Sequence, residues 1–483
     1  MLLGLDLGTT NIKALIVDLD GKVVAQGSKP VSLRHTDDGG IEQDIEEIWQ
    51  ATLQSIKSAA KQIDFARVRA VGISSQGGAI QVRDPSGRCI GPVISWMDNR
   101  GGPFDKQLQK NVGEEWLIAH LGHGLCAMAN GQVLRLQQND PALLKPPNVL
   151  GFVGDTIVQR LCGVAAHDHS SLSIASLYNP SLQQADHDLL EKLHLNAKQL
   201  PELLNARQPA GELKAEVAQE TNLPAGIPVG PAVHDQYAAA LGCGAIQTGD
   251  VMFGAGTAWV LLAVADHLPA PVTLSAWVCD HVVPQRWGQL LSLVVGGSAF
   301  KWTLDITGLA DESGENIDNL IESVPPGSDG LRLWPFQDAI GGQNRPSAGR
   351  FYGIKLSHGR GHFLRATLEG LCFELARQLN WLESGGCPVT RLIMCGGAAR
   401  SRSTTQIAAD VAARPVICPQ QSEISAFGAA ILARAMLENN ASLQELFRSM
   451  CGPAREIKPG PAASIYSSMV QEYIEAIEAA VSE

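Results

Sequence analysis

The chain has 483 residues, of which 45% are hydrophobic and 18% charged, and its formal net charge at pH 7 is −12. This length favours two sizeable domains over a single core. An acidic chain lacks the basic face that nucleic acid or anionic lipid requires, so we expect neither a nucleic acid nor a membrane as partner. Ten cysteines without paired spacing favour a reducing, cytoplasmic setting. Both a monomer and a homodimer remain open.

The first half of the chain predicts an α/β fold. Residues 2–7 and 11–17 form apolar runs that end in a turn, DLDG, and indicate a β-meander. Residues 41–63 carry apolar side chains at helical spacing, and RAVGISSQ and PVISWMD indicate short strands. Strands that alternate with helical stretches are typical of the α/β class.

A second cycle of strands and helices begins near residue 245. GDVMFGAGTAWVLLAVA again predicts strand, Gly-Thr turn and strand, and RLIMCGG followed by SRSTTQIAADV predicts a strand and a helix. We therefore expect two related domains, residues 1–245 and 246–483. Residues 103–150 and 309–348 are interpreted as loop-rich insertions, and residues 461–480 as a helix that packs back onto the body.

The opening LGLDLGTTNIK places one carboxylate, Asp6, inside an apolar strand. A plain β-hairpin with a polar turn does not explain it, because a buried lone carboxylate costs several kcal/mol. Backbone amides and hydroxyls of Gly8, Thr9 and Thr10 suit phosphate oxygens, with Lys13 in reach. Mg²⁺ beside Asp6, direct or through water, would supply the missing positive charge. Neither a Walker A loop nor a complete dinucleotide-binding fingerprint is present.

Two further glycine turns fit the same ligand. Gly256-Thr257 would place a second set of amides opposite the first turn. Gly396-Gly397-Ala398, between a strand and a helix, is either a simple strand end or a site where backbone approaches a flat nucleoside closely.

PAVHDQYAAALG places Asp235 and Gln236 at the start of a helix of small residues. Asp235 is either a helix cap or the general base that phosphoryl transfer to an alcohol needs. His234 is interpreted as a packing residue.

Two polar segments have competing interpretations. In WMDNR, residues Trp96, Asp98 and Arg100 either form a salt-bridged strand end or bind a polyhydroxylated ligand with an aromatic face and polar groups. In HDH, residues 167–169, capping or solvated side chains in a loop are favoured over metal ligands.

Together these motifs resemble the FGGY family of carbohydrate kinases, within the actin-like ATPase superfamily. The likeness covers most of the chain, in the order of the family's motifs. Its most specific part is GRFYGIKLSHGRGHFLRATLE, residues 349–369, which is similar to the family's C-terminal signature; EISAFGAAILA is similar to the closing helix.

The resemblance implies an ATP-dependent sugar kinase with two RNase-H-like domains and a cleft between them. It makes Asp235 the general base and Asp6 the Mg²⁺-associated carboxylate. The positions it assigns to ATP are Thr9, Thr10, Gly256, Thr257, Gly396 and Gly397, to which the residue pattern adds Lys13 and Ala398. Those it assigns to the sugar are Gln76, Gly77, Trp96, Asp98 and Arg100, and the pattern adds Asp235 and Gln236 beside them.

Departures from the family lie on the sugar side. Xylulokinases often show Gln-Met-His-Gly where this chain has Gln76-Gly77-Gly78-Ala79. The usual Gly-Glu-Arg-x-Pro stretch is reduced to GGQNRP at 341–346. GQVLRLQQNDP carries Gln132 and Arg135 in place of the lysine and tryptophan of the N-terminal signature. A pentulose such as xylulose is the first expectation, with ribulose, glycerol or erythritol as alternatives. An actin-like ATPase and a catalytically silent sugar sensor are the competing classes, and retention of Asp6 and Asp235 favours the enzyme.

Overall fold

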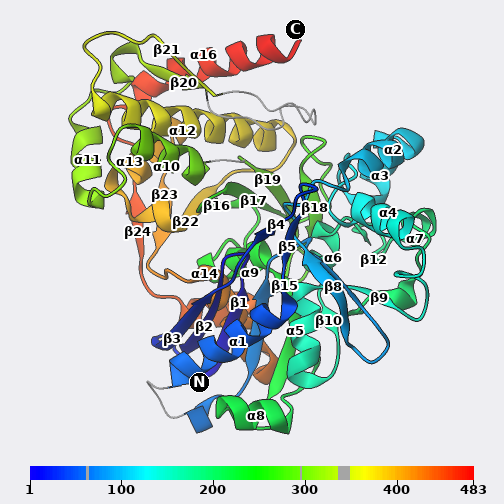
Figure 1. The fold of residues 1–483 in the computed structure, drawn as a ribbon. Helices are drawn as coiled ribbons and strands as arrows, with labels where there is room; N and C mark the ends of the chain where they lie inside the picture. Colours follow the sequence, from blue (N-terminus) through cyan, green and yellow to red (C-terminus); the bar gives the residue numbers. More distant parts are fainter. Residues whose placement is uncertain (61–64, 294–295, 335–348, 483) are drawn as a thin grey trace.

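A computed structural model describes residues 1–60, 65–293, 296–334 and 349–482. Its first main sheet belongs to the N-terminal half of the chain (Figure 1). In order across this sheet lie β13 (Glu202–Leu203), β10 (Ala166–His167), β15 (Pro228–His234), β6 (Val71–Ser75), β1 (Leu2–Leu7), β2 (Asn11–Val17) and β3 (Val23–Pro30), with β14 (Gly211–Glu212) beside β15. The predicted meander is thus β1, β2 and β3, joined antiparallel.

The second main sheet belongs to the C-terminal half. Its strands, in order, are β18 (Trp277–Asp280), β19 (Trp287–Ser292), β17 (Trp259–Ala265), β16 (Asp250–Ala255), β22 (Arg391–Cys395), β23 (Val416–Pro419) and β24 (Ala454–Ile457). Strands β16 and β17 pair antiparallel, and β16 pairs with β22 in parallel. The antiparallel hairpin beside a parallel strand repeats the arrangement of β1, β2 and β6, as the sequence predicts.

Smaller sheets complete the strands. One has the order β4 (Arg34–His35), β5 (Ile41–Gln43), β8 (Cys89–Ile94), β7 (Ile80–Arg83) and β9 (Val149–Phe152). The two-stranded ribbons are β11 (Tyr178–Asn179) with β12 (Gln184–Ala185) and β20 (Arg332–Trp334) with β21 (Arg350–Tyr352). Residues 41–43, predicted to begin the first helix, are therefore a strand.

Helices cover both halves. Those of the N-terminal half are α1 (Ile45–Ala60), α2 (Gly102–Val112), α3 (Glu114–Leu121), α4 (Ala129–Asn139), α5 (Val153–Cys162), α6 (His169–Ile174), α7 (His187–Lys192), α8 (Ala215–Thr221) and α9 (Asp235–Cys243). Those of the C-terminal half are α10 (Gly296–Ile306), α11 (Gly314–Glu322), α12 (Arg360–Ser384), α13 (Arg402–Ala412), α14 (Ile424–Leu437), α15 (Leu443–Met450) and α16 (Ala463–Ser482). None of those described has a stretch that is both long and apolar enough to cross a membrane.

The interpretation of residues 103–150 as loop-rich was wrong. Helices α2, α3 and α4 lie there and group together beside the main body (Figure 1). Helix α2 buries only Leu108, and α3 only Leu117 and Leu121. Helices with so few buried positions leave little apolar periodicity, which is why the sequence pattern did not reveal them. The described part of residues 309–348, the other segment interpreted as loop-rich, contains helix α11 and strand β20.

Helix α16 packs back onto the body, as predicted. The Tyr466 hydroxyl donates a hydrogen bond of 2.7 Å to Glu369 of α12, and Arg365 donates to the Tyr466 oxygen, also at 2.7 Å. All three side chains are buried. This polar contact fixes the last helix against the long helix of the C-terminal half.

Helix α14 belongs to the C-terminal half but lies against the N-terminal sheet. Gly4 of β1 and Gly72 of β6 are register partners. A Cβ atom on Gly4 would lie 1.9 Å from the backbone oxygen of Ala426, and one on Gly72 would lie 1.8 Å from that of Ala429. The paired glycines therefore leave the room that α14 occupies, which joins the two halves.

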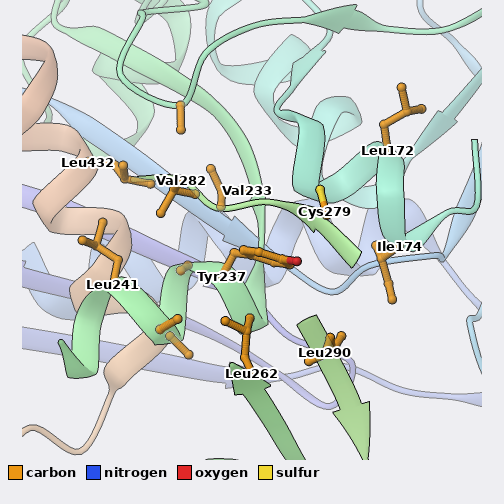
Figure 2. Packing of buried hydrophobic residues seen from close by; sticks show 14 of the residues in the cluster. Leu172, Ile174, Val233, Tyr237, Leu241, Leu262, Cys279, Val282, Leu290 and Leu432 are labelled. Atoms are coloured by element: carbon orange, nitrogen blue, oxygen red, sulfur yellow. The ribbon is translucent and has the colours of Figure 1, made fainter. Parts of the chain in front are cut away.

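An apolar core surrounds helix α9 and joins the two halves of the chain. Figure 2 shows Tyr237 of α9 among Val233, Leu262, Cys279, Val282 and Leu290, which come from both halves of the chain. The Tyr237 side chain is 2% exposed. The helix that begins with Asp235 is thus held by packing from both main sheets.

Candidate active site

Asp6 lies on β1 between Lys13 of β2 and Ser74 of β6. The Ser74 hydroxyl donates a 3.0 Å hydrogen bond to its Oδ1. Burial and, after it, the negative charge of Asp235 raise the pKa of Asp6 to about 7, although Lys13 opposes the change. The carboxylate thus lies in a buried position that disfavours its charged form, the unusual environment that the sequence suggested.

Lys13, expected to reach phosphates, pairs with a residue from the other half of the chain. Its Nζ is 2.6 Å from Oε2 of Glu423, immediately before α14. Both side chains line a cavity of about 300 Å³ together with Asp6, and Gln236 lines it as well. Sequence reasoning missed Glu423, whose segment was assigned only to the closing helix.

Side chains connect the first glycine turn to Gln76, which follows β6, and to Trp96, which follows β8. The Thr9 hydroxyl donates to Oε1 of Gln76 at 3.1 Å and accepts from Nε1 of Trp96 at 3.0 Å. Gln43 donates to the Thr9 carbonyl at 2.9 Å and accepts from Gln76 at 3.0 Å. These bonds hold Thr9, Gln76 and Trp96 as one unit, whereas Thr10 lies exposed at the turn.

Asp235 is the first residue of α9, where β15 ends. Nε2 of Gln236 donates to its Oδ1 at 3.1 Å, and Nε2 of His234 lies 3.2 Å from the same oxygen. Burial raises the pKa of Asp235 to about 6. A carboxyl group with such a pKa is ionised at neutral pH and still basic enough to accept a proton in catalysis.

The other wall of the site comes from the C-terminal half. Gly256 and Thr257, between β16 and β17, line both the 300 Å³ cavity and a neighbouring one of about 570 Å³. Gly396 lines the first, and Gly397 and Ala398 line the second. Phe300 and Leu304 of α10 and Leu368 of α12 add apolar surface to the larger cavity. Polar turns next to an apolar cavity of this size suit a nucleoside with phosphates attached.

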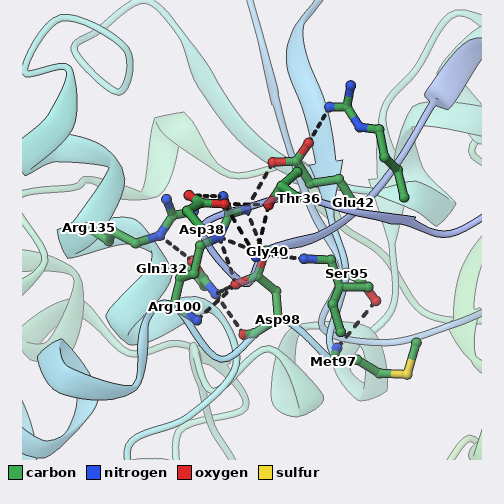
Figure 3. A network of polar contacts seen from close by, with 12 residues as sticks. Thr36, Asp38, Gly40, Glu42, Ser95, Met97, Asp98, Arg100, Gln132 and Arg135 are labelled. Atoms are coloured by element: carbon green, nitrogen blue, oxygen red, sulfur yellow. Dashed lines mark hydrogen bonds and ion pairs between the residues drawn. The ribbon is translucent and has the colours of Figure 1, made fainter.

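Asp98 and Arg100, which the family resemblance assigns to the sugar, form a polar network (Figure 3). The Arg100 guanidinium contacts Asp98 at 2.7 Å, Asp38 at 2.8 Å and Glu42 at 2.9 Å. Gln132 donates to Asp98 Oδ1 at 3.0 Å. These contacts support the interpretation of WMDNR as a salt-bridged strand end. Gln132, which departs from the family's signature, contributes a hydrogen bond to Asp98.

Trp96 is 41% exposed. It lines a cavity of about 860 Å³ together with Asp98 and Met128, and Trp277 from the C-terminal half forms part of the same wall. The aromatic side chain is therefore available to a ligand. The stretch GGQNRP lies outside the described residues.

Two comparisons identify relatives. Residues 1–242 match the N-terminal domain, and residues 251–437 the C-terminal domain, of the FGGY family of carbohydrate kinases. The chain is 27% identical to the xylulose kinase of Escherichia coli (strain K12) over 455 residues, covering 92% of each chain. It is also 27% identical to the L-fuculokinase of that strain over 451 residues, covering 89% of this chain and 91% of the relative.

Solved structures agree with the sequence comparisons. The crystal structure of xylulose kinase from Rhodospirillum rubrum matches with a TM-score of 0.89 at 25% identity, covering 99% of this chain and 98% of that one. A xylulose kinase structure from Brucella ovis gives the same TM-score and identity, covering 99% of each chain. The two domains thus have the actin-like ATPase fold. The chain belongs to the FGGY family of carbohydrate kinases and is a phosphotransferase with an alcohol group as acceptor.

Proposed function

We propose that the chain transfers the γ-phosphoryl group of ATP to a hydroxyl of a ketose, first of all a pentulose such as xylulose. The observation that carries this is the cavity in which Asp6 and Lys13 of the N-terminal half face Gly256, Thr257 and Gly396 of the C-terminal half. Xylulose kinases among both sequence relatives and solved structures support the choice of acceptor. The proposed domains are residues 1–245 and 246–483, and the proposed location is the cytoplasm.

Magnesium fits the residues present. Asp6 offers a carboxylate whose pKa is raised by burial and, after it, by the charge of Asp235, so a cation beside it would stabilise the ionised form. Oxygen atoms are the ligands that Mg²⁺ prefers. Asp6 would hold the ion directly or through water. When bound, the ion would neutralise charge on the β- and γ-phosphates.

The chain's own residues have the following proposed roles. Asp235 accepts the proton of the acceptor hydroxyl as the phosphoryl group transfers, with Gln236 beside it. Thr9, Thr10, Lys13, Gly256 and Thr257 contact phosphate, and Gly396, Gly397 and Ala398 contact adenosine. Gln76, Gly77, Trp96, Asp98 and Arg100 form or support the sugar side. Closure of the two halves would exclude water from the γ-phosphate.

A different ketose is the second candidate. The L-fuculokinase of Escherichia coli is as similar as its xylulose kinase, each at 27% identity. Gly77 and Gly78 also present no side chains at the end of the sugar-facing strand. Ribulose and polyols such as glycerol or erythritol remain the further alternatives.

ADP release from MgATP across a panel of ketoses, aldoses and polyols tests the proposal. We expect one ketose to give at least about tenfold higher kcat/KM than the others, a ratio that corresponds to ~1.4 kcal/mol of discrimination. Equal rates with every sugar and with none would contradict the proposed function.

Activity should depend on pH through Asp235. The base works only when ionised, and its pKa is raised to about 6. We therefore expect kcat/KM for the ketose to fall about tenfold per pH unit below that value and to level off above it. Rates measured from pH 4.5 to 8.5 at saturating MgATP check this, and a flat profile down to pH 4.5 would contradict it.

Gly297→Ala should weaken ATP binding. A Cβ there would lie 2.1 Å from the backbone oxygen of Gly256, so the Gly256-Thr257 turn would have to move. We expect KM for ATP to rise about tenfold, by the loss of positioned phosphate contacts, with the chain still folded. Gly359→Ala is the matched control, because its Cβ would meet nothing within 4 Å. Equal KM values for the two variants would refute the role of this turn.

A further inference from the structure

His234, interpreted from the sequence as a packing residue, lies beside the proposed base. Its Nε2 is 3.2 Å from Oδ1 of Asp235, and the residue is 5% exposed. Burial lowers the pKa of His234 to about 4, so the imidazole is neutral at working pH and carries one N–H. Its Nδ1 is buried and has no hydrogen-bond partner among the described residues. A proton on Nε2 would lie next to the carboxylate, at a distance of 3.2 Å between the heavy atoms but outside hydrogen-bond geometry in this structure.

The HDH segment holds the strand end that carries His234. Asp168 N–H donates to the Ala232 carbonyl at 2.9 Å, and the Ser171 hydroxyl donates to the same oxygen at 3.1 Å. The Ser170 hydroxyl donates to Asp168 at 2.6 Å and accepts from the backbone N–H of His234 at 3.1 Å. Asp168 also caps α6, as the capping interpretation predicted. Hydrogen bonds from the backbone and the side chains of residues 168–171 thus fix the backbone at His234.

Gly77 leaves the room that the imidazole occupies. A Cβ on Gly77 would lie 2.6 Å from Cδ2 and 3.0 Å from Nε2 of His234. It would also lie 2.3 Å from Cγ2 of Ile174 on α6, the helix that Asp168 caps. The His234 side chain therefore fits here because Gly77, which follows β6, has no side chain.

We propose that His234 is a positioning residue for Asp235: when the acceptor binds, its Nε2–H donates to the carboxylate and fixes which oxygen faces the acceptor hydroxyl. Catalytic hydrogen bonds that are poorly aligned without substrate often tighten in the complex. Asp168 and Ser170 hold the backbone of β15 up to His234, and Gly77 leaves room for the imidazole. The inference rests on the proposed role of Asp235 as general base.

The test compares His234→Met with His234→Gln. The two side chains have nearly the same shape, but only Gln carries an N–H donor at the position of Nε2. We expect Met to lower kcat about 10- to 100-fold by misplacing the base, with KM for MgATP unchanged, and Gln to recover most of the loss. The acid limb of the kcat/KM profile should move to higher pH in the Met variant, because a donor that favours the ionised carboxylate is gone. Equal activities of the two variants would overturn the proposal.

Gly77→Ala provides a second, independent measurement. It displaces the imidazole without deleting it, so it should lower kcat in the otherwise unchanged chain and have much less effect in the His234→Met background. Additive effects would overturn the proposal. If His234→Met does not fold, a normal kcat for Gly77→Ala overturns the proposal, and a reduced kcat with unchanged KM for both MgATP and the ketose supports it.

Asp235→Asn, measured alongside, separates this inference from the proposed function. If Asp235→Asn keeps its activity, the proposed general base is wrong. If Asp235→Asn is inactive while His234→Met matches the unchanged chain, only the positioning role is wrong.

Discussion

Asp235→Asn is expected to lower kcat for ketose phosphorylation about 10³-fold, within the range that a positioned general base contributes. The side chain keeps its size and its place at the start of α9, but the amide cannot accept the proton of the acceptor hydroxyl. ATP binding should persist, because the proposed phosphate contacts come from other residues. Steady-state kinetics with the best ketose, together with direct measurement of ATP affinity, check both parts.

Asp20→Asn serves as the matched control. Asp20 is an exposed carboxylate in the turn between β2 and β3. Its replacement should leave kcat within about twofold, since surface substitutions away from special features have small effects. If Asp235→Asn retained a tenth or more of the activity, another group would have to act as the base.

Gly428→Ala should destabilise the whole chain by about 3 kcal/mol, at the upper end of what overpacking usually costs. A Cβ on Gly428 of α14 would lie 1.8 Å from the backbone oxygen of Ala238 on α9. Helix α14 cannot simply move away, because the backbone atoms of Ala426 and Ala429 lie against Gly4 and Gly72. Alanine otherwise favours a helix by up to ~1 kcal/mol over glycine, so a net loss reports the clash.

Gly452→Ala is the control for this measurement. Its Cβ would meet nothing within 4 Å, and the free energy of unfolding should change by less than about 0.5 kcal/mol. Denaturant unfolding of both variants, followed by circular dichroism, gives the comparison. A Gly428→Ala chain as stable as the Gly452→Ala chain would show that α9 and α14 can separate at little cost.

The features that sequence predicted well are those that depend on local pattern. The hairpin around Gly8, the strand and helix around Asp235, and the turns at Gly256 and Gly396 each combine an apolar run with a residue that is typical of a turn or a helix start. A carboxylate inside an apolar strand also pointed to an unusual environment, and the raised pKa of Asp6 agrees with it.

The features that sequence did not predict depend on contacts between distant segments. The pair of Lys13 and Glu423 joins residues 410 positions apart, and the neighbours of Arg100 include Asp38 and Glu42 from another strand pair. A single sequence also gives no sign that Gly77 leaves room for the side chain of His234. Such side chains have ordinary local patterns, and only the folded chain brings them together.

The fate of the γ-phosphoryl group tests the central claim most directly. Phosphorus NMR of the chain with MgATP and its best ketose would follow the group into either a sugar phosphate ester or inorganic phosphate. The account predicts one equivalent of sugar phosphate for each ADP, little inorganic phosphate, and slow ATP turnover when the sugar is left out. Rapid release of inorganic phosphate at the same rate with and without the ketose would contradict it and favour an ATPase.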